Sequence, residues 1–122
     1  MQQTTTRLLT AILVSLTGAA AADAHAFLSQ AVPPVGGVIS ASPSEIRITF
    51  TDGIEPAFSG IELASAEGQP IKTGPATVDP RDNTQLVLPV LRLGPGQYRV
   101  TWHVVSVDMH RTEGAYGFQI KP

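Results

Sequence analysis

The sequence predicts an all-β protein: a seven-stranded antiparallel sandwich or barrel with Greek-key connections. Short segments of alternating apolar and polar residues recur about every 8–14 residues between turn formers. No stretch has the 3.6-residue apolar period of a substantial helix. Ten prolines and eleven glycines among 122 residues suit a fold that is rich in turns.

The first half of the predicted domain contains three strands and a long loop. A strand over 26–32 ends at consecutive prolines and paired glycines. Strict alternation over 45–50 puts three apolar side chains on one face. The segment 51–59 contains Asp-Gly and Glu-Pro pairs, so it is predicted to be a loop. A strand over 60–64 follows, and turn signals across 65–81 leave room for one or two short edge strands.

The second half contains three further predicted strands, over 84–89, 97–107 and 115–120. In the longest of these, four alternate positions are apolar and share one face. The only tryptophan, Trp102, is one of the four and is predicted to lie at the centre of the core. A polar segment, 108–114, is predicted to be the loop between the last two strands.

Residues 1–24 have the order of a secretory signal peptide. A single cation, Arg7, is followed by an apolar run over 8–16 and then by an alanine-rich tail. The run is shorter than the ~20 apolar residues that span a bilayer as a helix. We therefore expect a cleaved signal instead of a retained anchor.

The cleavage site decides how the mature chain begins. Small residues at Ala22 and Ala24 favour cleavage after Ala24. Cleavage after Ala26 also fits the pattern and would remove His25. We expect the first cut, which leaves residues 25–122 as one β-sandwich domain with a histidine at its N-terminus.

Composition excludes several classes of protein. The chain has no cysteine, which rules out a disulfide framework, thiolate zinc sites and cysteine nucleophiles. The formal net charge is −2, and basic residues neither predominate nor cluster, so nucleic-acid binding is not expected. Any metal must be bound by nitrogen, carboxylate or thioether donors.

The chain has three histidines, two of them in its C-terminal part. His103 alternates with polar residues on the predicted outer face of its strand and is expected to be an exposed strand residue. His110 follows Asp108 by two positions, a spacing that puts both side chains on the same side of an extended chain. Because loops of a sandwich commonly carry function, this D-x-H segment is a candidate metal or catalytic site.

His25 strengthens the metal interpretation. As a first residue it offers its α-amine and ring Nδ1 as a chelating pair, and Asp108 and His110 would bring the set to three nitrogens and one oxygen. Such a mixed set suits tetragonal Cu(II). Zinc could occupy the same donors tetrahedrally, and His25 could also be a disordered terminal residue.

Four blocks of the sequence carry a family resemblance: His25-Ala26, 50–58, 98–110 and 114–118. Together they resemble the CopC family of periplasmic copper-binding proteins, over essentially all of the mature chain. The specific part is W-x-V-V-S-x-D-x-H placed before G-x-Y-x-F. The resemblance implies a cupredoxin-like or immunoglobulin-like β-barrel or sandwich.

The resemblance also implies a metal site. One Cu(II) per chain would be bound by the amine and ring of His25, by Asp108 and by His110. Asp52 would orient a ligand nitrogen, although an ordinary Asp-Gly turn explains it equally well. Met109 stands where the family usually has glycine, and a positive φ there would strain it. No methionine-rich loop is present, so the implied type binds Cu(II) only.

The function implied is that of a periplasmic carrier or buffer for Cu(II) in copper resistance and homeostasis, without enzymatic activity. Its partners would be the copper ion and an inner-membrane copper transport protein, with neither nucleic acid nor a lipid anchor involved.

Two alternatives stay open. A metal-free sandwich for adhesion or assembly is favoured if His25 is trimmed. A copper-brace oxidative enzyme is opposed by the small size of the chain and by Asp108, which would fill a needed copper position. A hydrolytic triad of Ser106, Asp108 and His110 is not expected, because residues so close in sequence lack the required geometry.

Overall fold

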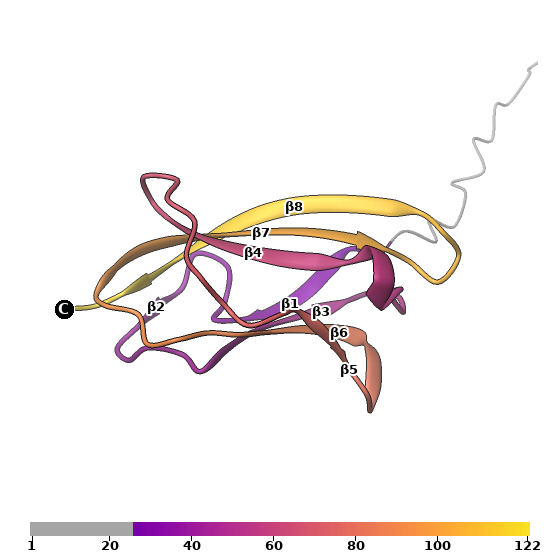
Figure 1. The fold of residues 1–122 in the computed structure, drawn as a ribbon, viewed down its shortest axis with the longest axis horizontal. Coiled ribbons are helices and arrows are strands. Elements are labelled where there is room, and N and C mark those ends of the chain that lie inside the picture. The colour runs from indigo at the N-terminus through magenta and orange to yellow at the C-terminus, as the bar shows by residue number, and fades with distance from the viewer. Residues whose placement is uncertain (1–25) are drawn as a thin grey trace, which may run out of the picture.

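The computed structural model describes residues 26–122. His25 and the predicted signal peptide lie outside this range. Two four-stranded sheets face each other in the described part (Figure 1). One sheet has the order β1 (Leu28–Val32), β3 (Glu45–Phe50), β6 (Asp82–Pro89), β5 (Thr77–Asp79). The other has the order β2 (Val38–Ile39), β8 (Arg111–Ile120), β7 (Gly96–Val105), β4 (Gly60–Ser65).

The predicted β-sandwich is confirmed, with two differences in its strands. The short β2 adds an eighth strand to the described part and pairs parallel to β8, whereas the other pairings between strands are antiparallel. Two residues are too few to show alternation, so the sequence gives no sign of β2. The described helical structure is one 3₁₀ turn, η1 (Pro56–Phe58), and no helix in residues 26–122 is long and apolar enough to cross a membrane.

The second difference concerns β8, which begins at Arg111 instead of at residue 115. Its pairing with β7 continues without a break from Gly96↔Ile120 to Val105↔Arg111. The additional inward positions are Thr112 and Gly114, which are not apolar and therefore read as loop residues. The loop between β7 and β8 is correspondingly short, residues 106–110.

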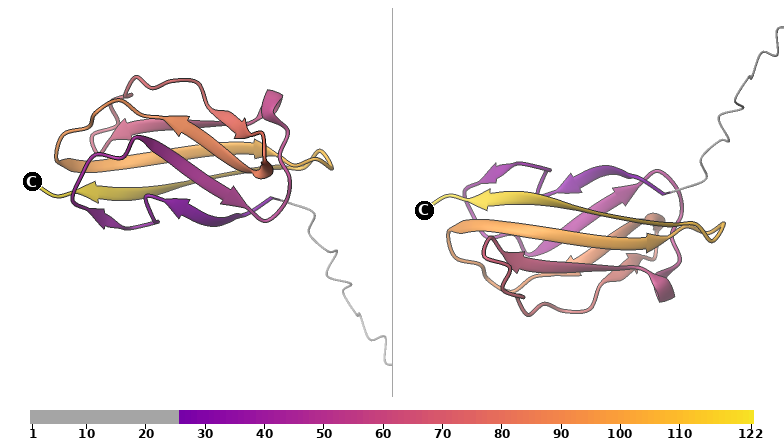
Figure 2. Two further views of the ribbon diagram at one scale, coloured as in Figure 1. Left: turned by 90° about the horizontal axis from the view of Figure 1, so that it is seen from below. Right: turned by 90° about the horizontal axis from the view of Figure 1, so that it is seen from above.

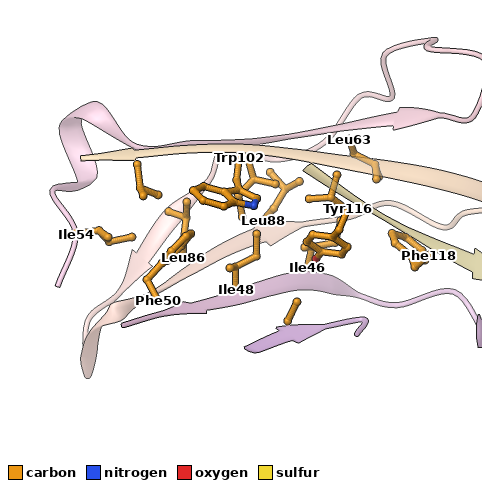
Figure 3. Close-up of a cluster of buried hydrophobic side chains, with 14 of the residues drawn as sticks. Ile46, Ile48, Phe50, Ile54, Leu63, Leu86, Leu88, Trp102, Tyr116 and Phe118 are labelled. Carbon is orange, nitrogen blue, oxygen red and sulfur yellow. The ribbon is translucent and has the colours of Figure 1, made fainter. Parts of the chain in front are cut away.

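The core lies between the two sheets and is built from the alternate positions that the sequence predicts (Figure 3). Trp102 of β7 is 7% exposed, and its ring lies edge-on to Phe50 of β3 at a centroid distance of 5.1 Å. Its cross-strand partner on β8 is Gly114, over which the indole lies: a Cβ there would be 2.6 Å from Trp102 Cζ2. The core position of Trp102 is confirmed.

Three segments meet at one end of the sandwich: the start of the described chain, the segment 51–58 and the 106–110 loop (Figures 1 and 2). Backbone hydrogen bonds join them. Thr51 N donates to Phe27 O at 2.8 Å, and Val107 N donates to Gly53 O at 2.9 Å. The segment 51–58 thus lies between the chain start and the loop that carries the D-x-H motif.

Candidate metal centre

The 106–110 loop is a tight reversal closed by backbone hydrogen bonds. Ser106 N donates to His110 O at 2.9 Å, and Met109 N donates to Ser106 O at 2.8 Å. Ser106 pairs on its other side with Ile54 in an isolated antiparallel bridge. The base of the loop is therefore fixed to the sandwich, while residues 107–110 are exposed.

Ser106 is fully buried and organises the loop from inside. It is 0% exposed, and its hydroxyl donates a short hydrogen bond to Asp108 Oδ1. The Ser106 hydroxyl oxygen also accepts a hydrogen bond from His110 N at 3.2 Å. One side chain thus holds both members of the D-x-H motif.

Asp108 and His110 are in contact, although the loop is a tight turn and not the extended chain on which the spacing prediction rested. His110 Nδ1 lies 3.2 Å from Asp108 Oδ1, with 52% and 34% of the respective side chains exposed. The Ser106 hydroxyl lowers the pKa of Asp108 most; partial burial opposes this, and His110 lowers it further. The carboxylate is therefore ionised at neutral pH, and it can accept a hydrogen bond from the imidazole or bind a cation.

The start of the described chain is anchored beside this pair. Ala26 is 0% exposed, and its carbonyl oxygen accepts a hydrogen bond of 2.5 Å from Thr112 Oγ1. Phe27 N donates to Thr51 Oγ1 at 2.9 Å. Since Thr112 follows His110 by two residues on β8, Ala26 lies next to the loop. The predicted ligand His25 precedes Ala26 and lies outside the described residues.

Asp52 adjoins the loop through its neighbour. Its Oδ1 accepts a hydrogen bond from Gly53 N at 2.8 Å, the contact of an Asp-Gly turn, and Gly53 O accepts one from Val107 N. A Cβ at Gly53 would be 2.6 Å from Asn83 Nδ2, so a larger residue would require the Asn83 side chain to move. A role for Asp52 in orienting a metal ligand stays a prediction.

His103 lies elsewhere, on the outer face of β7, exposed as predicted. It pairs with Glu113 of β8 and covers Gly60 of β4, where a Cβ would be 2.7 Å from its Cε1. This face is hollowed by a depression of about 580 Å³, lined in part by Phe58 and Arg111. His103 serves below as a matched control for His110.

Residues 26–122 contain no group of three or more His, Cys, Asp or Glu side chains close enough to hold a metal ion. The described part of the site therefore supplies the pair Asp108 and His110.

Ser106 contacts both Asp108 and His110, and sequence reasoning did not assign it to the candidate metal centre. Ser106 matches no catalytic motif, and its burial could not be predicted from the sequence. The available clue was its position: a serine at the end of the apolar strand, two residues before an aspartate.

Met109 has φ of 69°, the only positive φ at a non-glycine residue in the described part of the chain. Its side chain is 64% exposed at the tip of the loop. The positive φ under which methionine would be strained at this position is thus present.

The fold and the loop define a class: a two-sheet β-sandwich with an Asp–His pair at one end, next to the start of its first strand. The CopC domain family model matches residues 28–121. The chain belongs to the CopC family.

Individual relatives are consistent with membership of this family. Protein YobA of Escherichia coli (strain K12) is 41% identical over 99 residues, which cover 80% of each chain. Copper resistance protein C of Xanthomonas campestris pv. juglandis is 33% identical over 120 residues, covering 91% of this chain and 94% of the relative. The crystal structure of CopC from Methylosinus trichosporium OB3b superposes with a TM-score of 0.76 at 33% identity, covering 80% and 95% of the two chains.

Proposed function

We propose that this protein binds one Cu(II) ion in the periplasm and acts as a carrier or buffer in copper resistance and homeostasis. The observation that carries the proposal is the Asp108–His110 pair, 3.2 Å apart, on a loop beside the anchored start of the chain. Family membership and the copper resistance proteins among the relatives support it.

The anchoring of Ala26 supports a role for the residue that precedes it. Consecutive Cα atoms are about 3.8 Å apart, so residue 25 is held close to Ala26, which Thr112 fixes beside the loop. Cleavage after Ala24 would then create an α-amine next to the imidazole of His25, at the same end of the sandwich as His110. Export would complete the site.

The ligand set that we infer is the amine and ring of His25 with Asp108 and His110. In the structure Nδ1 of His110 is turned to Asp108. Because Nε2 points away from that carboxylate, binding of one copper by both residues would replace the contact between them, with the carboxylate and the imidazole each turned to the metal. Nitrogen and carboxylate donors favour Cu(II), whereas Cu(I) prefers soft sulfur donors.

A site on an exposed loop suits exchange of the metal better than permanent storage. His110 is half exposed, so an incoming chelating group can approach the copper directly. We infer that the exchange partner is a membrane copper transport protein. We also infer that the protein binds copper without catalysing a reaction. Asp52 is assigned the role of orienting a ligand from behind the loop.

Copper titration of the exported protein tests the proposal. Its N-terminal residue is first determined by mass spectrometry, and Cu(II) binding is then followed by Trp102 fluorescence and by electron spin resonance, which reports the nitrogen ligands. His110→Ala should weaken binding by about tenfold or more, and His103→Ala, the matched control on the outer face of β7, should leave it unchanged. Equal losses in both variants, or a mature chain that begins at Phe27 and still binds copper tightly, would refute the assignment.

A further inference from the structure

We propose that the Met109 thioether, together with His110, binds Cu(I), so that the same loop takes copper in both oxidation states. This inference rests on the proposed function, because it assumes that copper reaches the loop. It extends the site beyond the Cu(II)-only type that the family resemblance implies.

The backbone supplies the first observation. Met109 occupies the left-handed region with φ of 69°, where an L-residue with a side chain costs about 1–2 kcal/mol and glycine costs little. The loop closes through the hydrogen bond from Met109 N to Ser106 O, so it needs this conformation. A side chain is therefore present where the backbone favours none.

Core packing does not account for that side chain. Met109 is 64% exposed and projects from the tip of the loop, whereas the buried residue of the loop is Ser106. Replacing methionine by glycine would leave no cavity. The fold thus gains nothing from Met109, which directs attention to its chemistry.

The thioether is a soft donor that prefers Cu(I), and its neighbours are the groups inferred to bind Cu(II). His110, next in the chain, offers an imidazole nitrogen, which either oxidation state accepts. Asp108 is held by Ser106 and His110 and is a hard oxygen donor, suited to Cu(II). Three consecutive residues thus present a hard, a soft and an intermediate donor, so that Asp108 with His110 would bind Cu(II) and Met109 with His110 would bind Cu(I).

The sulfur can be assigned without ambiguity. The chain has no cysteine and two methionines, Met1 and Met109, so Met109 is the only sulfur in residues 25–122. X-ray absorption of the exported protein loaded anaerobically with Cu(I) should reveal one sulfur scatterer, which is lost in Met109→Leu. Cu(I) affinity, measured by competition with a chromogenic chelator, should fall at least about tenfold in that variant.

Two variants separate sulfur chemistry from loop conformation. Met109→Leu keeps the bulk and the strain without sulfur, and Met109→Gly removes both sulfur and strain. We expect equal losses of Cu(I) affinity in the two and unchanged Cu(II) affinity. Cu(I) affinity retained in the leucine variant, or no Cu(I) binding by the native protein, would overturn the inference. If Cu(II) also failed to bind, the proposed function itself would be wrong.

Discussion

At the scale of single residues, Ser106 determines the geometry of the candidate metal centre. It is fully buried, yet its hydroxyl group contacts Asp108 and the backbone of His110. Buried hydroxyl groups are retained where they satisfy specific partners, because an unpaired polar group in the interior is costly. The serine is thus the link between the core and the exposed pair of donors.

Ser106→Ala should destabilise the protein by about 1–3 kcal/mol, because His110 N would lose a hydrogen-bond acceptor. It should also raise the pKa of Asp108 towards the ordinary value of about 3.9, since the Ser106 hydroxyl is the largest cause of its lowering. Urea unfolding measures the first effect, and an NMR titration of the Asp108 carboxyl carbon measures the second. The exposed β1 residue Ser29, changed to alanine, should alter neither; an unchanged pKa of Asp108 in the Ser106 variant would contradict the role given to the serine.

Met109→Gly should stabilise the metal-free protein. Relief of the left-handed strain is worth about 1–2 kcal/mol, and the greater freedom of glycine in the unfolded chain offsets about 0.4–1 kcal/mol. A net gain of about 0.8 kcal/mol is expected, within a range of about 0 to 1.6 kcal/mol, and is measurable as a higher urea midpoint. Met109→Leu, which keeps the strain, should stay within about 0.5 kcal/mol of the native protein; equal stability of all three proteins would mean that the loop carries no strain.

At the scale of the elements, the β7–β8 hairpin carries the site because it is long and firmly packed. Its register runs unbroken to Val105↔Arg111, which brings Thr112 to the chain start and puts residues 106–110 beyond the sheet. The close approach of Trp102 to Gly114 fixes this hairpin to the core. A loop mounted on such a rigid base keeps Asp108 and His110 together.

Gly114→Ala tests that packing. The new Cβ would be 2.6 Å from Trp102 Cζ2, and Trp102 is confined by Phe50, so the strands must shift at a cost of about 1–3 kcal/mol. Urea unfolding and near-ultraviolet circular dichroism of Trp102 measure the effect. Gly117→Ala in the same strand is the control, since its Cβ would lie 3.4 Å from Tyr98 O, an ordinary contact; similar losses in both variants would show that strand glycines matter for another reason.

At the scale of the whole molecule, the candidate site depends on distant segments that converge on one end of the sandwich. Ala26 and Thr112 are 86 positions apart in sequence and joined by a hydrogen bond. The segment 51–58 is bound to the chain start and to the 106–110 loop by backbone hydrogen bonds with Phe27 and Val107. Copper binding should therefore depend on the intact fold.

Acid should weaken that fold. The pKa values of Asp79, Asp82 and Asp108 are lowered, chiefly by hydrogen bonds from Arg81 N, the Thr84 hydroxyl and the Ser106 hydroxyl respectively. A folded pKa below the unfolded value stabilises the native state above about pH 4, and this contribution is lost as the pH falls through the folded values. The urea midpoint should thus be lower at about pH 3 than at about pH 6.

The double variant Asp79→Asn, Asp82→Asn isolates the contribution of the β5–β6 hairpin. It should lose part of the difference in stability between the two pH values, because two of the three carboxylates with a lowered pKa no longer titrate. Copper is left out of these measurements. A pH dependence identical to that of the native protein would show that other groups control acid unfolding.

The sequence alone determined the β-sandwich and most of its core, because the alternation of apolar and polar residues along a strand is a local property. The buried alternate positions Ile46, Ile48 and Phe50 of β3, and Val100 and Trp102 of β7, show it directly. It also predicted, from the spacing of two in an extended chain, that Asp108 and His110 share a side; the contact between them instead forms within a tight turn. It missed the two-residue β2 and placed the start of β8 too late, because inward-facing Thr112 and Gly114 carry no apolar signal.

Only the tertiary structure decided how those two residues are supported. The burial of Ser106, the positive φ of Met109 and the bond from Thr112 to Ala26 depend on contacts between segments that are far apart in sequence or on backbone angles that composition does not encode. Local patterns specify strands and faces. The convergence of the chain start with the last hairpin comes from the packing of two sheets, and it is this convergence that makes a short motif a candidate metal centre.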